Sequence, residues 1–306
     1  MKCVSFFFKE KDSSPAKFIN ILAKMAPSAK DHPMQYFAAS ALASAMGYPL
    51  WRAAAIGQSG FEMHVIQVGR FTVPHTITPY VYGFLPPYKG MVATVFGMTW
   101  ARAAIFWLSD YGHDVLLKNG YSVSTATVTP PLLISALVQV VNQPIVRSTV
   151  TLQDPKYNLP NVFSSVKQIY STHGIPGLWH GTTAGILKTV PKYVTAIAVK
   201  DIMEEHLPQP DPNSPTYHTD RLGRSLVKSA AAGIAGAALT NPLDVIRNEQ
   251  FKTHTGIRET TKKLWNEMGI SFMARGLGKN LVAVAMPVGM TIFFTDLFVQ
   301  MTLDKN

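Results

Sequence analysis

Six long apolar stretches alternate with polar connections along the chain. The first, third and fifth, here called the odd helices, lie near Met34–Gln58, Pro131–Leu152 and Leu222–Phe251. The second, fourth and sixth, the even helices, lie near Met91–Leu117, Gly181–Leu207 and Leu277–Leu303. Each approaches the roughly 20 apolar residues that span the hydrocarbon core of a bilayer. The pattern therefore predicts six membrane-crossing helices.

Two shorter amphipathic segments, near Val162–Thr172 and Thr261–Met268, predict short helices between the long ones. Small residues are frequent in the odd helices, as in Ala38–Ala45, and they let membrane helices pack closely without a hydrophobic driving force. A large soluble helical array is the competing interpretation. It fits poorly with Met91–Leu108, in which Arg102 is the only charged residue. We therefore predict an all-α membrane protein.

A threefold repeat organises these helices. Three eight-residue segments begin and end with glycine: Gly83–Gly90, Gly174–Gly181 and Gly269–Gly276. An aspartate stands 20 residues after each closing glycine, and a proline ends the apolar run before each segment. The aspartates are Asp110, Asp201 and Asp296, and the prolines are Pro49, Pro144 and Pro242. The phasing predicts a single domain, residues 33–303, built from repeats 33–120, 127–207 and 220–303.

Composition narrows the function classes. Only 15% of the 306 residues are charged, against about 25% in soluble domains, and 47% are hydrophobic. The single cysteine, Cys3, excludes a disulfide scaffold and zinc sites built on cysteine. The histidines show no metal-ligand spacing, and no phosphate-binding loop or activated nucleophile is apparent. We therefore expect no enzyme activity, no metal and no cofactor.

The net charge of +10 is compatible with nucleic acid, an anionic membrane face or an anionic substrate. The basic residues are scattered between the apolar stretches, which disfavours nucleic acid. Residues 1–32 form a basic N-terminal extension with six lysines. Because this segment also contains Glu10, Asp12 and Asp31 and no arginine, it differs from a transit peptide, and we expect a retained extension at the membrane surface.

Over residues 33–303 the chain resembles the mitochondrial carrier family, whose odd helices end in P-x-[DE]-x-x-[KR]. Pro242-Leu-Asp244-Val-Ile-Arg247 matches this motif, and Gly177-Leu-Trp-His-Gly181 followed by Lys188-x-x-Pro191 is similar to the second family signature. The resemblance implies six transmembrane helices in a pseudo-threefold bundle, with short amphipathic helices on the matrix side. It also implies the mitochondrial inner membrane and transport by alternating access.

The resemblance implies a matrix-side gate with an acid two residues after each proline and a base five residues after it. The acid positions hold Trp51, Val146 and Asp244, and the base positions hold Ala54, Thr149 and Arg247. Pro49, Pro144, Pro242, Asp244 and Arg247 are therefore what remains of this gate. Because the family pairs acids and bases between odd helices, Asp244 has no basic partner waiting at Ala54 or Thr149. Arg52 and Arg147 are expected to extend towards the aqueous interface.

The gate on the other side is implied to pair the aspartates of the even helices with bases three residues later. Those positions hold His113, Glu204 and Val299, so Asp110, Asp201 and Asp296 have a single weak partner, His113. The predicted substrate contacts are Gly97, Lys188, Thr189 and Val284. Lys188 would attract an anion in a low-dielectric cavity, although we slightly favour the interpretation of a hydrated lysine in a vestigial cavity. Lys192, one turn further on, is an alternative anchor.

The family's cardiolipin sites combine helix N-termini with an aromatic-basic-glycine step, and helix N-termini suit phosphate groups. The predicted lipid contacts are Tyr88, Lys89, Gly90, Trp179, His180, Gly181, Arg275 and Gly276.

Two functions follow from the degenerate gates. We favour a non-transporting accessory subunit of an inner-membrane assembly, such as a respiratory complex, with cardiolipin and other membrane subunits as partners. The alternative is an active transporter of a small anionic, carboxylate-type metabolite with Lys188 as the substrate anchor.

Overall fold

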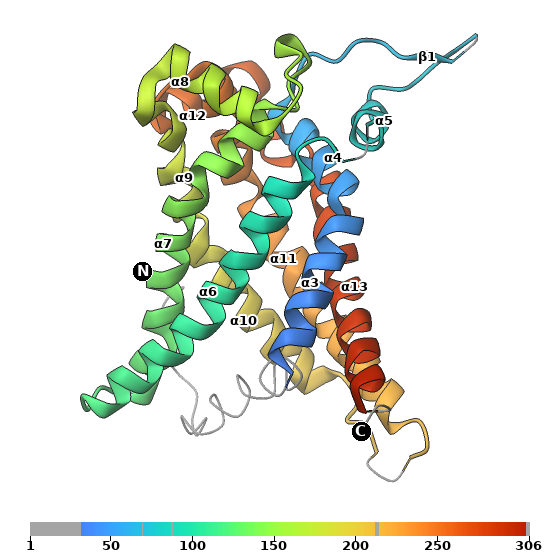
Figure 1. The fold of residues 1–306 in the computed structure, drawn as a ribbon, viewed down its shortest axis with the longest axis vertical. Helices are drawn as coiled ribbons and strands as arrows, with labels where there is room; N and C mark the ends of the chain where they lie inside the picture. The colour runs from blue at the N-terminus through green and yellow to red at the C-terminus, as the bar shows by residue number, and fades with distance from the viewer. Residues whose placement is uncertain (1–31, 69, 87, 212–213, 304–306) are drawn as a thin grey trace.

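A computed structural model describes residues 32–303, except residues 69, 87 and 212–213, as an almost entirely helical protein (Figure 1). The predicted N-terminal extension, residues 1–32, lies outside the described residues except for its last residue. The long helices are α3 (Pro33–Met46) with α4 (Tyr48–Ser59), α6 (Met91–Lys118), α7 (Val123–Thr151), α9 (Thr182–Leu187) with α10 (Thr189–His206), α11 (Tyr217–Thr253) and α13 (Leu277–Leu303). They coincide with the six predicted apolar stretches.

The shorter elements lie in the connections. They are α5 (Thr78–Phe84), α8 (Val162–Trp179), α12 (Ile257–Met268), the 3-10 helices η1 (Pro155–Tyr157) and η2 (Gly269–Ala274), and the strands β1 (Gln67–Val68) and β2 (Phe71–Thr72). The two strands pair antiparallel, with Gln67 opposite Thr72. Helices α8 and α12 contain the two predicted amphipathic segments, and Figure 1 shows both at one end of the molecule, here called the α8/α12 end.

Two prolines interrupt long helices at defined places. A proline has no N–H and its ring meets the carbonyl four residues earlier, so a helix breaks just before it. Pro49 follows the break between α3 and α4, and Pro191 follows the break between α9 and α10, which falls at Lys188. Pro144 and Pro242 lie inside α7 and α11, which continue through them.

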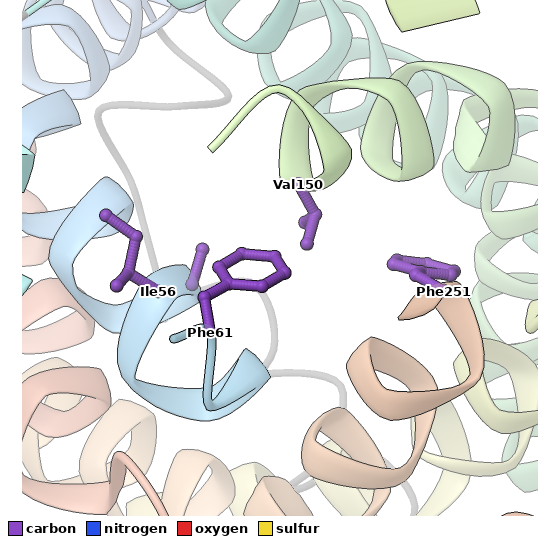
Figure 2. Packing of buried hydrophobic residues seen from close by; sticks show 5 residues of the cluster. Ile56, Phe61, Val150 and Phe251 are labelled. Atoms are coloured by element: carbon purple, nitrogen blue, oxygen red, sulfur yellow. The ribbon is translucent and has the colours of Figure 1, made fainter. Parts of the chain in front are cut away.

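The long helices pack as neighbours in chain order. Contacts join α3 to α6, α6 to α7, α7 to α10, α10 to α11, α11 to α13, and α13 back to α3. At the α8/α12 end, an apolar cluster joins α4, the segment after it, α7 and α11. Figure 2 shows Ile56 and Phe61 facing Val150 and Phe251 in this cluster. These buried contacts hold the ends of the three odd helices together.

Three stretches of the described chain are long and apolar enough to cross a membrane: Met91–Lys118, Thr125–Thr151 and Ile257–Val299. The prediction of an all-α membrane protein is therefore confirmed at that level. The six-span pseudo-threefold arrangement is not established by these three stretches, because α11 and α10 carry more charged and polar residues than the other long helices.

The closing glycines of the three repeated segments share one backbone conformation. Gly90, Gly181 and Gly276 have φ of 87°, 82° and 70°, a left-handed conformation that residues with a Cβ adopt only at a cost. Each glycine directly precedes an even helix. A Cβ on Gly276 would lie 2.6 Å from the backbone nitrogen of Gln58. The chain at position 276 can therefore approach α4 this closely only if the residue has no side chain.

We expect Gly276→Ala to destabilise the protein markedly more than Gly120→Ala. Both glycines have positive φ, but a Cβ on Gly120 would meet no atom within 4 Å. Gly120→Ala should therefore cost only the conformational term of about 1 kcal/mol. Gly276→Ala adds a backbone overlap, which raises the cost by a further 1–3 kcal/mol or so. Thermal unfolding of the two detergent-solubilised variants measures the difference, and equal midpoints would contradict the predicted contact.

Candidate functional site: a buried ion-pair cluster

Three charged side chains meet inside the bundle where α9 and α10 face α11. Lys188 Nζ lies 2.7 Å from Asp244 Oδ1, and Arg247 Nη2 lies 2.9 Å from the same oxygen. The three side chains are only 14%, 13% and 10% exposed. The helix break at Lys188 and the spacing of Asp244 and Arg247, three residues apart on one face of α11, bring the groups together. We call these residues the Lys188 cluster.

Asp244 has a basic partner on another helix, at a position that the family's gate pattern does not include. The predicted base positions, Ala54 and Thr149, are buried and uncharged, as the sequence requires. The partner is instead Lys188, which lies at the α9/α10 break in an even helix. It stands 56 residues before Asp244 in the sequence. The sequence reasoning considered only pairs between odd helices, so it assigned Lys188 to substrate and missed its contact with Asp244.

The Lys188 cluster keeps one positive charge, because two cations share one carboxylate. Further polar groups surround it: Arg247 Nε and Gln143 Oε1 are buried without a hydrogen-bond partner among the described residues. A Cβ on Gly185 would lie 3.4–3.8 Å from Gln139, Arg247 and Gln143, so this glycine lets those polar side chains approach α9. A buried site with surplus positive charge and free polar atoms is suited to hold an anionic group.

Arg52 and Arg147 do not extend to an aqueous interface, contrary to expectation. Their exposed fractions are 3% and 1%. Arg52 donates to Gln153 Oε1 (2.7 Å), to the Gly83 carbonyl oxygen (3.0 Å) and to the Pro86 carbonyl oxygen. Carbonyl and amide acceptors at the α8/α12 end satisfy its donors inside the protein, which the sequence pattern could not reveal.

Glu249 forms a second ion-pair centre that the sequence analysis did not identify. Its carboxylate, 2% exposed, lies 2.9 Å from Arg275 Nη2, 3.0 Å from Lys263 Nζ and 3.4 Å from Lys252 Nζ. These bases belong to α11, to α12 and to the segment before α13. This centre, here called the Glu249 hub, therefore holds the α8/α12 end of the third repeat together. Sequence spacing could have indicated only the pair with Lys252, three residues later on α11, because Lys263 and Arg275 stand 14 and 26 residues away.

At the opposite end, the described part of the structure shows no pair between the predicted gate residues His113 and Asp110. His113 Nδ1 lies 3.4 Å from Asp114 Oδ1, whereas Asp110 is exposed. The side chains of Asp201 and Asp296 lie outside the described part of the structure. Glu204, which occupies a predicted base position, accepts from Arg224 (2.9 Å) and Lys228 (2.5 Å) and thereby joins α10 to α11.

The other predicted substrate positions lie against neighbouring helices. The backbone of Gly97 contacts α7, because its carbonyl oxygen accepts from Asn142 Nδ2 at 3.0 Å. Val284 packs on Gly233 of α11, and the Thr189 hydroxyl donates to the carbonyl oxygen of Gly185 at 3.2 Å. Of the predicted contacts, Lys188 is the one that makes a charged interaction in the described structure. Their role towards a substrate stays a prediction.

Some of the predicted lipid contacts are exposed, and others already interact with groups of the protein. Tyr88 and Trp179 are exposed, and the Trp179 indole donates to the Val140 carbonyl oxygen. The Arg275 guanidinium is held by Glu249 and by the Gln58 carbonyl oxygen, at 2.9 and 2.8 Å. The glycines contact helix ends, as described above, and Lys89 accepts through its carbonyl oxygen from Tyr48 Oη. Lipid binding by these residues stays a prediction.

Three histidines stack at the α8/α12 end. The ring of His254 lies 3.8 Å from that of His173 and 4.3 Å from that of His180, centroid to centroid. Arg147 Nη2 lies 3.2 Å from His254 Nδ1. Burial, then the neighbouring His180, His173 and Arg147, lower the pKa of His254 to about 4. Burial also lowers the pKa values of His173 and His180.

Stability is therefore expected to decline as the pH falls. The unfolded chain binds a proton at His254 near pH 6.5, whereas the folded chain does so only near pH 4, so acid between these values favours unfolding. His254→Asn removes this group and suits the left-handed φ of 55°. Thermal midpoints at pH 7.5 and pH 5 should differ less for the variant than for the wild type. If the midpoint of the variant falls between pH 7.5 and pH 5 as much as that of the wild type, the pH dependence does not come from His254.

Comparisons with known proteins agree with this architecture. The family model for mitochondrial carrier proteins matches residues 123–211 and 218–306. The chain is 24% identical to the mitochondrial ornithine transporter 1 of Saccharomyces cerevisiae over 59% of the chain, and it spans only 60% of that relative's length. It is 23% identical to mitoferrin of Dictyostelium discoideum, over 66% of the chain and 71% of the relative.

It is also 24% identical to the mitochondrial arginine transporter BAC2 of Arabidopsis thaliana, over 67% of the chain and 70% of the relative. The family model covers more than half of the residues, and its two matches coincide with the second and third repeats. Apolar helices of sufficient length to cross a bilayer accompany the match. The chain therefore belongs to the mitochondrial carrier family and sits in the mitochondrial inner membrane.

Proposed function

We propose that this protein transports a small carboxylate-bearing metabolite across the inner membrane by alternating access. The observation that carries the proposal is the Lys188 cluster. It links two helices through an ion pair that the substrate can replace, and it keeps one positive charge when closed. A carboxylate arriving at Lys188 competes with Asp244 for the ammonium group, which releases α9 and α10 from α11.

The preference for a non-transporting accessory subunit is not supported. It rested on the absence of the family's acid–base pairs between odd helices, and the Lys188–Asp244 contact supplies an interhelix pair of another kind on the α8/α12 side. The reported relatives are named as an ornithine transporter, an arginine transporter and a mitoferrin, and none of these names describes a structural subunit. The transporter alternative therefore fits better.

Alternating access needs a closure on each side of the substrate, and the bundle offers one for each end. In the proposed six-helix pseudo-threefold arrangement, the Lys188 cluster lies towards the α8/α12 end, which the family resemblance assigns to the matrix. Glu204 with Arg224 and Lys228 lies at the opposite end. Both closures join α11 to the fourth apolar stretch, so both differ from the family's pairs between odd helices and between even helices.

The charge of the site favours a carboxylate over a simple cation. Asp244 is already shared by two bases, so a cation without a carboxylate finds no free acid in the cluster. Amino acids such as the substrates named for two relatives also carry a carboxylate. We therefore include ornithine, arginine and glutamate with di- and tricarboxylates among the test substrates.

Counter-exchange in liposomes containing the purified full chain tests the proposal. Internal and external carboxylates are varied in turn, and uptake of radiolabelled substrate is measured against empty liposomes. At least one carboxylate is expected to exchange saturably. If none exchanges, and the protein migrates in native gels of mild-detergent extracts only as part of a large complex, the accessory function is restored and the proposal fails.

A further inference from the structure

Arg147 is a buried cation whose donors are largely unused. Its guanidinium is 1% exposed, and its printed polar contact is that of Nη2 with His254 Nδ1 at 3.2 Å. Nε and Nη1 are buried without a hydrogen-bond partner among the described residues. The Phe251 ring, 5.7 Å away, offers only a cation–π contact. Within the described chain no carboxylate lies within 4 Å of this guanidinium.

The equivalent arginine of the first repeat shows that this arrangement is not imposed by the fold. Arg52 and Arg147 each stand three residues after the repeat's proline, and both are buried. Arg52 donates to three protein oxygens, from Gln153, Gly83 and Pro86. Arg147 has no such set. Since a buried charge without compensation is strongly unfavourable, Arg147 requires a negative partner that the described chain does not supply.

A small cavity adjoins these unused donors. It has a volume of about 20 Å³ and is lined by side chains that include Arg147, Lys252, Asp154, Thr151, Thr172 and His173. A space of this size accommodates one water-sized particle. The lining carries two cations and one carboxylate, and Asp154 also accepts from the backbone N–H of Lys156 at 3.0 Å. Lys252 Nζ already binds the Ser59 and Gly60 carbonyl oxygens and Glu249, and the Thr172 hydroxyl donates to the Gln168 carbonyl oxygen. The unused donors beside the cavity are therefore those of Arg147, next to room for a single small anion.

We propose that this cavity is a binding site for one monovalent, halide-sized anion, held by Arg147 and joining α7 to α8 and α11. The Nε and Nη1 groups of Arg147 supply the main contacts. His254 contributes indirectly, because its neutral ring accepts from Arg147 and orients the guanidinium. The site is separate from the Lys188 cluster and independent of what the protein transports.

The thermal stability of the purified full chain tests this site. Chloride or bromide replaces gluconate at constant ionic strength, and the unfolding midpoint is followed as the halide concentration rises. We expect a saturable rise of about 3 °C in the wild type, since a ligand that binds only the folded state stabilises it. Arg147→Gln should abolish the rise. Arg52→Gln is the matched control: it removes the equivalent buried cation and should leave the halide response intact.

A second measurement does not depend on a variant that folds. Crystals of the wild-type protein grown or soaked with bromide should show an anomalous peak within hydrogen-bond distance of the Arg147 guanidinium. A halide response that survives Arg147→Gln, the absence of any response in the wild type, or an empty cavity at saturating bromide overturns the proposal. In the last two cases an ordinary buried water occupies the space.

Discussion

Lys188→Ala is expected to reduce carboxylate exchange by liposomes containing the protein at least 100-fold. The change removes the cation 2.7 Å from Asp244 and lowers the cluster from one surplus positive charge to none. Losing a buried charge contact with the substrate carboxylate costs about 3 kcal/mol or more of binding free energy, which corresponds to two or more orders of magnitude in affinity. Initial rates of counter-exchange, normalised to the amount of protein incorporated, measure the effect.

Lys192→Ala is the matched control for this prediction. Lys192 lies about one turn further along α10 and is exposed, so its loss should change exchange less than threefold or so. Lys188→Met combined with Asp244→Asn separates folding from transport. This double variant keeps the site uncharged apart from Arg247, so it should fold yet remain inactive. Full activity of Lys188→Ala would remove Lys188 from the mechanism, and an active double variant would show that the ion pair is dispensable.

Glu249→Gln is expected to cause a large loss of stability at the α8/α12 end. The carboxylate is 2% exposed and compensates Arg275, Lys263 and Lys252. The amide of glutamine can still accept from Arg275, but it leaves three cations facing one another. A cost of about 3 kcal/mol follows from uncompensated buried charge, and it corresponds to a fall of roughly 5 °C in the thermal midpoint.

Glu267→Gln provides the comparison, because Glu267 also approaches Lys263 but at 3.9 Å and with 55% exposure. An exposed pair of this kind contributes little, so the midpoint should change by about 1 °C or less. Differential scanning fluorimetry of both variants in the same detergent measures the two thermal midpoints. Similar small shifts for the two substitutions would mean that Glu249 is not the centre of the hub.

Several features of the fold could be predicted because they depend on local chemistry. The lengths of the apolar stretches predicted where α6, α7 and α13 lie. The repeated glycines marked the three entries to the even helices, where the structure needs positive φ. Periodicity and backbone sterics act over a few residues, so the sequence shows them directly.

The charged contacts could not be predicted in the same way. Lys188 reaches Asp244 across 56 residues, and Arg147 reaches His254 across 107. The family pattern directed attention to pairs between odd helices, and the actual partner of Asp244 lay on an even helix. The sequence shows that charge is scarce, but not which of the remaining charges meet.

The sequence by itself determined the class of the protein: an all-helical membrane chain of three repeats, with a proline and a glycine step in each repeat. Only the tertiary structure decided that Asp244 is paired, that Arg52 and Arg147 are buried, and that Glu249 joins three bases. The physical reason is that burial and ion pairing depend on distances across the bundle. A one-residue change in helix rotation or a single proline break turns the same side chain towards lipid, a partner or the interior.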